Sequence, residues 1–229
     1  MAEKGTVFFD MDDTLVEWTV RWHDCFVQTA AEHGVTVTAA RAKKALLQTF
    51  KAEYRACIRR HAESSDEVAF WIDFDARVLA ALGVKEDAPR ATERVVELLK
   101  NPDNVRLFPD AADTLAALQE LGYGLGIVTS RPKADPDLER LGIRRFFGPV
   151  VDAFAARGVK GEPHVFPFAR SRTADVDAPA WHVGDDYHDD IVAARQAGFR
   201  AVLIDRTDRY SDRDCARITA LSQLEQVLK

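Results

Sequence analysis

Hydrophobic and polar residues follow two different patterns along this chain. From about residue 17 to 104, apolar residues recur at spacings of three and four, which is typical of one face of an α-helix. From residue 105 onward, short apolar runs alternate with stretches of helical spacing. The patterns predict helices near 19–33, 42–58, 64–82, 89–100 and 135–141, and strands at 5–9, 124–128, 149–151, 180–183 and 201–204.

Residues that favour helix ends stand at the boundaries of these segments. Thr38 is suited to cap the helix at 42–58, and Asp110 is suited to cap a later one. Ser64 and Glu67 have the spacing of a capping box at the start of the helix that runs to residue 82. A glycine follows several of the predicted helices, as a left-handed C-terminal cap requires: Gly83, Gly122, Gly142 and Gly198.

The order of elements predicts an α/β protein with an inserted helical domain. Strands that alternate with helices form parallel sheets with helices on both faces. The strand at 5–9 must join this sheet, because a lone strand beside a helical bundle leaves its backbone groups unpaired. We therefore assign residues 1–16 and 105–229 to the α/β core, and residues 17–104 to a bundle of four helices inserted into it.

Composition argues against several classes of protein. The chain has 229 residues and a formal net charge of −6, which disfavours nucleic-acid binding. No apolar stretch approaches the length of a membrane span, and no apolar leader precedes the first strand. Cys25, Cys57 and Cys215 are odd in number and widely spaced, so neither a disulfide framework nor a zinc site is indicated. We expect a soluble, cytoplasmic protein, with its oligomeric state left open.

The end of the first predicted strand has the most informative chemistry. Apolar residues there give way to Asp10, Asp12, Asp13 and Thr14. Because residues i and i+2 of an extended strand point the same way, Asp10 and Asp12 are expected to leave the strand tip on one face. Two such carboxylates repel each other unless a cation lies between them, and Mg²⁺ takes oxygen ligands of this kind. The alternative is an acidic turn in which Asp13 or Thr14 caps a helix.

Other predicted strands also end in polar residues. The strand at 124–128 leads into Thr129, Ser130 and Arg131, and the strand at 180–183 leads into the acidic run 184–190. Lys160 precedes a helix that a proline begins. Taken singly, these are equally well a hydroxyl-rich turn, a solvated acidic loop and a surface lysine. Together they fall where an open parallel sheet binds its ligands, beyond the carboxyl ends of the strands.

These segments resemble the four motifs of the haloacid dehalogenase superfamily of phosphohydrolases, in the family's order and over nearly the whole chain. Residues 10–15 are similar to its first motif, Asp-x-Asp-x-Thr after an apolar strand, and 127–129 resemble the second. Lys160, followed by Pro163 and Phe166, resembles the third motif. Gly184 and Asp185, followed by Asp189 or Asp190, resemble the fourth, and the spacing favours Asp190. The insertion lies where one subgroup has its cap domain. The resemblance therefore implies a Rossmann-like core with a helical cap.

The resemblance implies a role for each carboxylate. Asp10 would be the nucleophile that attacks phosphorus and forms an aspartyl-phosphate. Asp12 would protonate the leaving oxygen and then accept a proton from the hydrolytic water. Mg²⁺ would be held by the Asp10 side chain, the Asp12 carbonyl and Asp185, with Asp190 orienting water bound to the metal.

The remaining groups would bind the substrate. Thr129 would hydrogen-bond a phosphoryl oxygen, and Ser130 belongs to the same hydroxyl cluster. Lys160 would neutralise charge on Asp10 and on the phosphoryl group. Arg131 is placed to reach an anionic substrate or to form a surface ion pair. His182, inside a predicted strand, is expected to be a core residue.

The combined prediction is a Mg²⁺-dependent phosphomonoesterase that acts on a small phosphorylated metabolite, with no nucleic-acid or membrane partner. Asp12 favours phosphoryl transfer over dehalogenation, because a departing halide needs no proton and the dehalogenase members lack this carboxylate. A phosphosugar mutase is the alternative within the family, since it shares these groups and this type of cap. Alternatives of a different class are a receiver-like phospho-acceptor, which the motif order disfavours, and a non-catalytic binding module.

Overall fold

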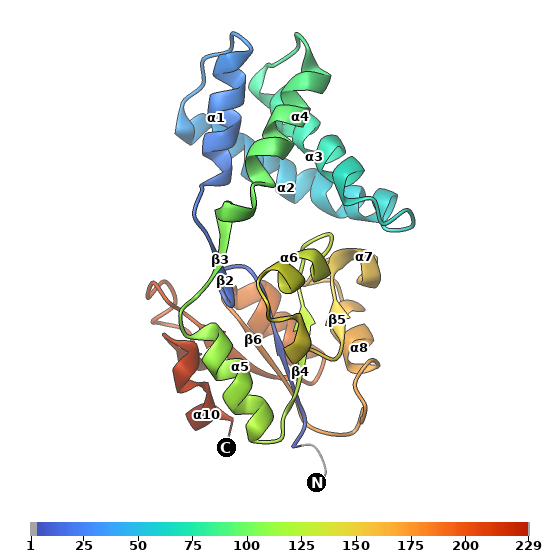
Figure 1. Cartoon of the computed structure of the whole chain (residues 1–229), viewed down its shortest axis with the longest axis vertical. Coiled ribbons are helices and arrows are strands. Elements are labelled where there is room, and N and C mark those ends of the chain that lie inside the picture. Colours follow the sequence, from blue (N-terminus) through green and yellow to red (C-terminus); the bar gives the residue numbers. More distant parts are fainter. Residues whose placement is uncertain (1–3, 229) are drawn as a thin grey trace. The chain divides into compact units, whose positions relative to one another are not determined.

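The computed structural model describes residues 4–228, which divide into two compact units. The first, the α/β core, contains the residues up to Glu17 and those from Arg106 onward, and the second, the helical unit, contains Trp18–Val105. The chain passes between the units through β2 (Val16–Trp18) and β3 (Val105–Leu107), which pair as a separate two-stranded sheet (Figure 1). These two short strands were not predicted.

A six-stranded sheet forms the centre of the α/β core. Its strands are β1 (Thr6–Phe9), β4 (Gly124–Val128), β5 (Val150–Val151), β6 (Ala180–Gly184), β7 (Arg200–Ile204) and β8 (Ala216–Ile218). They lie in the order β5-β4-β1-β6-β7-β8, and neighbouring strands run parallel. The first strand therefore joins the sheet formed by the second part of the chain, as predicted. Among these six strands, only β8 gave no apolar pattern in the sequence, because it is short and two of its three residues are exposed.

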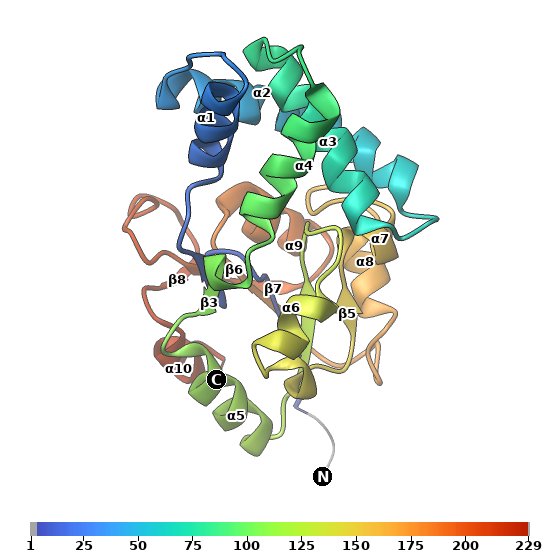
Figure 2. The ribbon, with the colours of Figure 1, turned by 45° about the horizontal axis from the view of Figure 1, so that its top comes forward.

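Helices cover both faces of this sheet, which confirms the predicted α/β fold. They are α5 (Ala111–Glu120), α6 (Asp135–Arg140), α7 (Ala153–Ala156), α8 (Val165–Arg170), α9 (Ala193–Gln196) and α10 (Leu224–Val227). On one face, Phe166 of α8 and Ala194 of α9 belong to the same buried cluster as Phe8 and Leu203 of the strands. The helices α5 and α10 lie on the other face (Figures 1 and 2). Because both faces are covered, the central strands are buried throughout.

The helical unit is a bundle of four helices, α1 (Trp22–Glu32), α2 (Ala39–His61), α3 (Glu67–Leu82) and α4 (Ala88–Leu99). Phe70 and Phe74 of α3 are fully buried and meet Tyr54 of α2 edge to face. Such aromatic pairs add about 0.5–1.5 kcal/mol beyond the area that they bury. Within the described residues, no helix is long and apolar enough to cross a membrane. The three cysteines are free thiols.

Most predicted helix ends are confirmed. Thr38 caps α2 by accepting a hydrogen bond from the Arg41 backbone N–H at 3.2 Å. The four glycines named above all have the positive φ of a left-handed residue. The predicted capping box at Ser64 is wrong. Ser65 adopts a left-handed conformation with φ 52°, and α3 begins only at Glu67, so Asp66 is the N-cap and accepts from the Ala69 N–H.

Two acidic caps also differ from expectation. Asp110 precedes α5, but its carboxylate accepts hydrogen bonds from Arg206 and from the Leu221 backbone instead of capping the helix. In the acidic run after β6, the N-cap is Asp186, not Asp189 or Asp190, and it accepts from two backbone N–H groups at 2.8 Å. Residues far away in the sequence set the first of these contacts, so local spacing could not predict it.

A carboxylate lies unpaired inside the helical unit. Asp75 of α3 is 1% exposed, and neither of its oxygens has a hydrogen-bond partner among the described residues. Burial raises the pKa of Asp75 well above its usual value, because the ionised form is poorly solvated there. The proton is therefore bound more tightly in the folded chain than in the unfolded chain.

Replacement of Asp75 by asparagine is expected to stabilise the protein by about 1–3 kcal/mol at pH 8. The gain should grow as pH rises from about 4, because the unfolded aspartate ionises near its ordinary pKa while the folded one keeps its proton. Urea unfolding of the wild type and the variant at pH 5 and pH 8 measures this difference. Glu63→Gln, the same acid-to-amide change at an exposed position, is the control. A gain that does not change with pH would contradict the assignment.

Candidate active site

The register of the sheet brings three strand ends together. Phe9 of β1 pairs with Ile127 of β4 on one side and with Val183 of β6 on the other. Asp10 follows directly, and its backbone N–H donates to the Val183 carbonyl at 2.9 Å. Thr129 and Asp185, which follow β4 and β6, therefore lie on either side of Asp10. Parallel strands place their carboxyl ends at one edge of a sheet, and the candidate site lies at that edge.

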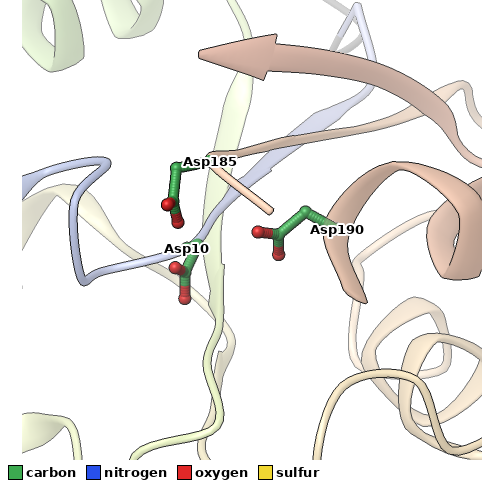
Figure 3. Close-up of side chains that lie close together, drawn as sticks. All are labelled: Asp10, Asp185 and Asp190. Atoms are coloured by element: carbon green, nitrogen blue, oxygen red, sulfur yellow. The ribbon is translucent and has the colours of Figure 1, made fainter. Parts of the chain in front are cut away.

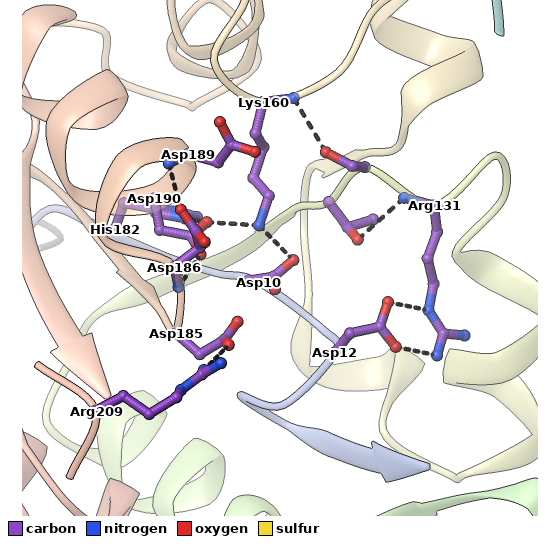
Figure 4. Close-up of polar contacts among 12 residues, drawn as sticks. Asp10, Asp12, Arg131, Lys160, His182, Asp185, Asp186, Asp189, Asp190 and Arg209 are labelled. Carbon is purple, nitrogen blue, oxygen red and sulfur yellow. Dashed lines mark hydrogen bonds and ion pairs between the residues drawn. The ribbon is translucent and has the colours of Figure 1, made fainter. Parts of the chain in front are cut away.

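Lys160 joins two carboxylates at this edge. Its Nζ lies 2.8 Å from Asp10 Oδ1 and 2.5 Å from Asp190 Oδ1 (Figure 4). All three side chains are buried, at 6% exposure or less. Burial raises the pKa of Asp10 well above its usual value, although Lys160 opposes this effect. Burial acts the same way on Asp190, but Lys160 and His182 outweigh it and hold the pKa of Asp190 well below its usual range.

Asp190 is fixed in place from several directions. His182 Nε2 donates to Asp190 Oδ1 at 2.8 Å, and the Asp186 backbone N–H donates to Oδ2 at 3.0 Å. A Cβ on Gly184 would lie 2.2 Å from the Asp190 Cγ, so only glycine leaves room for this side chain. The first turn after β6 is the π-helical segment η3 (Tyr187–Val192), a distortion often found at functional sites. It directs Asp190 inward, whereas its neighbour Asp189 is exposed.

Three carboxylates converge on one point. One oxygen from each of Asp10, Asp185 and Asp190 lies within 4.8 Å of the others (Figure 3). Burial and the Asp190 carboxylate raise the pKa of Asp185 to about 7. Arg209, from the loop after β7, pairs with Asp185 at 2.9 Å. All-oxygen donors that crowd together in this way suit a hard dication such as Mg²⁺, which would relieve their repulsion.

The Asp12 carboxylate is not among these converging groups, although Asp10 and Asp12 were expected to leave the strand on one face. Strand pairing ends at Phe9, and the chain then turns through Asp13, whose φ is 55°. The alternation of an extended strand therefore does not continue to Asp12. Its carboxylate accepts two hydrogen bonds from Arg131, at 2.9 Å from Nε and 2.5 Å from Nη2 (Figure 4). No helix follows this turn, so the helix-capping alternative for Asp13 does not apply.

The hydroxyl cluster after β4 faces the same region. Thr129 is 2% exposed, and its Oγ1 accepts from the Arg131 backbone N–H at 3.3 Å. The hydroxyl hydrogen of Thr129 can therefore be donated to a ligand oxygen. Ser130 Oγ accepts from the Lys160 backbone N–H at 3.1 Å, which ties the Lys160 loop to the end of β4.

The structure thus brings most of the predicted site residues to one edge of the sheet. Asp10, Lys160, Asp185 and Asp190 converge directly, with Thr129 beside them, while Asp12 and Arg131 form a separate pair. Sequence reasoning assigned His182 to the core and overlooked Arg209. His182 is fully buried, but it also bonds Asp190. His182 and Gly184 are two residues apart in β6 and therefore share a face of the sheet. The glycine was thus a sign in the sequence that another group packs against this face beside His182.

A sequence profile of the haloacid dehalogenase-like hydrolases matches residues 7–204. The chain therefore belongs to the haloacid dehalogenase-like hydrolase family.

Two relatives whose names state an activity are phosphatases. The glyceraldehyde 3-phosphate phosphatase of Methanothermobacter thermautotrophicus is 27% identical over 235 residues, covering 97% of this chain and 98% of that protein. The phosphoglycolate phosphatase of Escherichia coli K12 is 37% identical over 98 residues, covering 42% of this chain and 38% of that protein. Both of these relatives are named as phosphatases.

Solved structures share the fold over the whole chain. A haloacid dehalogenase-family phosphatase from Thermococcus onnurineus has a TM-score of 0.68 at 24% identity, covering 98% of this chain and 97% of that one. A 2-haloacid dehalogenase from Pseudomonas syringae pv. Tomato DC3000 has a TM-score of 0.67 at 27% identity, with the same coverage. Both a phosphatase and a dehalogenase therefore have this fold, so the reaction has to be argued from the site residues.

Proposed function

We propose that this protein is a Mg²⁺-dependent phosphomonoesterase that acts on a small phosphorylated metabolite through an aspartyl-phosphate on Asp10. The observation that supports this most is the contact of a buried Asp10 with Lys160, beside the converging Asp185 and Asp190 carboxylates. A nucleophilic carboxylate, a neutralising cation and hard oxygen ligands are the groups that phosphoryl transfer requires.

The residues suit a divalent cation. Asp10, Asp185 and the Asp12 carbonyl would hold it, and it would screen the repulsion between these carboxylates and an anionic substrate. Both oxygens of Asp190 already accept hydrogen bonds from protein donors, so Asp190 is better suited to orient the metal's water ligands than to bind the metal directly. The raised pKa values of Asp10 and Asp185 are the effect that a dication would reverse.

The reaction follows from the roles of four side chains. A carboxylate oxygen of Asp10 attacks phosphorus, the bond from phosphorus to the leaving oxygen breaks, and the carboxyl of Asp12 gives that oxygen its proton. Water then attacks the phosphorus of the aspartyl-phosphate, gives a proton to Asp12 and releases phosphate and the Asp10 carboxylate. Lys160 neutralises charge throughout, and the Thr129 hydroxyl donates to a phosphoryl oxygen.

We also propose that the helical unit, Trp18–Val105, which corresponds to the insertion expected at residues 17–104, acts as the cap that selects the substrate. Trp18, Trp22 and Trp71 form a row within this unit, with ring centroids 5.1 and 5.4 Å apart in edge-to-face contacts. All three are half-buried, so each presents part of an aromatic surface to solvent. A cytoplasmic location is part of the proposal, and the three free thiols support a reducing compartment.

Hydrolysis of 4-nitrophenyl phosphate tests the proposal. Phosphate release is expected to require Mg²⁺, to stop when EDTA is added and to return when Mg²⁺ is restored in excess. A phosphate-release screen across metabolites then identifies the ester. Activity that survives chelation would contradict the metal requirement. A need for a bisphosphate activator would favour the mutase, and halide release from a 2-haloacid without phosphate release would favour a dehalogenase.

A further inference from the structure

Arg131 is a buried guanidinium with two carboxylate partners at the edge of the site. Its Nε and Nη2 donate to the two oxygens of Asp12, and its Nη1 pairs with Asp137 of α6. Asp137 is held in turn by Arg140 at 2.8 Å. Only 10% of the Arg131 side chain is exposed, against 35% for Asp12. The guanidinium is therefore the fixed partner, and Asp12 is the accessible one.

This ion pair occupies the side chain that the proposed reaction uses for proton transfer. Both Asp12 oxygens accept hydrogen bonds from Arg131, so the carboxylate is turned toward the guanidinium while the pair holds (Figure 4). Proton transfer requires a carboxyl within hydrogen-bond reach of the leaving oxygen. Asp12 therefore has to leave Arg131 first. A charged pair with two hydrogen bonds resists separation unless another anion replaces the one that leaves.

We propose that a carboxylate of the substrate replaces Asp12 on Arg131, and that this exchange turns Asp12 toward the leaving oxygen. The inference rests on the proposed function and narrows its substrates to phosphorylated hydroxy acids, in which a carboxylate lies close to the ester oxygen. The Nε and Nη2 edge of Arg131 already holds a carboxylate in the planar geometry that a substrate carboxylate would adopt. Asp137 keeps the guanidinium in place during the exchange.

A matched pair of substrates tests the exchange. 2-Phosphoglycolate and 2-hydroxyethyl phosphate have the same ester and chain length and differ only in a carboxylate against a hydroxymethyl group. The wild type is expected to favour phosphoglycolate by at least about 10²-fold in kcat/KM, because 2-hydroxyethyl phosphate has no carboxylate that can replace Asp12 on Arg131. The difference should lie in kcat as well as KM, since the exchange also releases Asp12.

Variants of Arg131 separate charge from geometry. In Arg131→Gln the kcat/KM values for the two substrates are expected to differ by no more than about threefold, because the side chain that binds a carboxylate through two hydrogen bonds is gone. Arg131→Lys should restore only part of it, since an ammonium keeps the charge but not the planar fork. The control is Arg144→Gln, which removes an arginine that pairs with the nearby Asp135, and it should keep the wild-type preference.

The outcomes separate this inference from the proposed function. A wild type without preference, or equal losses on both substrates in Arg131→Gln, would overturn the exchange and leave the phosphatase proposal intact. The wild-type comparison needs no variant, so it decides the point even if Arg131→Gln does not fold. If neither substrate nor 4-nitrophenyl phosphate released phosphate, the proposed function itself would be wrong.

Discussion

Replacement of Asp10 by asparagine is expected to reduce phosphate release by roughly 10⁴–10⁶-fold, which is the scale of losing a catalytic nucleophile. The amide nitrogen and oxygen of asparagine do not attack phosphorus as a carboxylate does, so no covalent intermediate forms. The fold should survive, because asparagine has the shape of the buried acid and adds no charge. Phosphate release at saturating Mg²⁺ and circular dichroism measure the two effects.

Asp189→Asn is the matched control for this variant, because it makes the same change at an exposed aspartate in the acidic run after β6. It should keep most of the activity. A second readout follows the wild type during turnover, where acid quenching and mass spectrometry should detect a phosphoryl group on the peptide that contains Asp10. An unchanged rate in Asp10→Asn would refute the mechanism, and a phosphoryl group on another aspartate would reassign the nucleophile.

Replacement of Lys160 by methionine is expected to have the largest effect on stability as well as to abolish activity. The ammonium lies between Asp10 and Asp190, at 2.8 and 2.5 Å, and all three groups are buried. Burial opposes a charged lysine, but these two carboxylates raise the pKa of Lys160 above its usual value. Removing one partner of such a cluster leaves buried charge uncompensated, which costs about 3–5 kcal/mol. Urea unfolding in EDTA measures this loss without compensation from a bound dication.

Lys44→Met is the control, because Lys44 is exposed on α2 and the substitution is the same. It should change stability by no more than about 0.5 kcal/mol. Addition of Mg²⁺ should recover part of the stability of Lys160→Met, since a dication among the carboxylates replaces some of the lost positive charge. A Lys160→Met protein as stable as the wild type in EDTA would show that the carboxylate cluster does not depend on this lysine.

The fold was predictable wherever the sequence pattern is strong. The central strands β1, β4, β6 and β7 are buried on both faces and read as continuous apolar runs, and four helices of the inserted unit show clear spacing. Three strands without such a pattern were not predicted, namely β2, β3 and the mostly exposed β8, and neither were the short helices α7 and α10. These three strands are short, and β2 and β3 owe their position to backbone pairing with each other across the inserted unit.

The candidate site divides in the same way. The ends of apolar strands were readable, and parallel strands must place those ends at one edge, so the grouping of Asp10, Thr129 and Asp185 could be expected. Which side chains pair there depends on strand register and on the path of each loop. The contacts of Asp12 with Arg131 and of Asp185 with Arg209 join residues 119 and 24 positions apart, and no local pattern encodes them.

The sequence by itself therefore determined the order of the elements, the strand that leads into Asp10 and the residue types at the edge of the sheet where the candidate site lies. It could do so because periodicity and strand direction are local properties. Only the tertiary structure decided how the three acidic residues after β1 are used. Lys160 faces Asp10, Arg131 holds Asp12, and Asp13 takes the left-handed turn. The physical reason is that a charged side chain takes the partner that folding brings within hydrogen-bond reach.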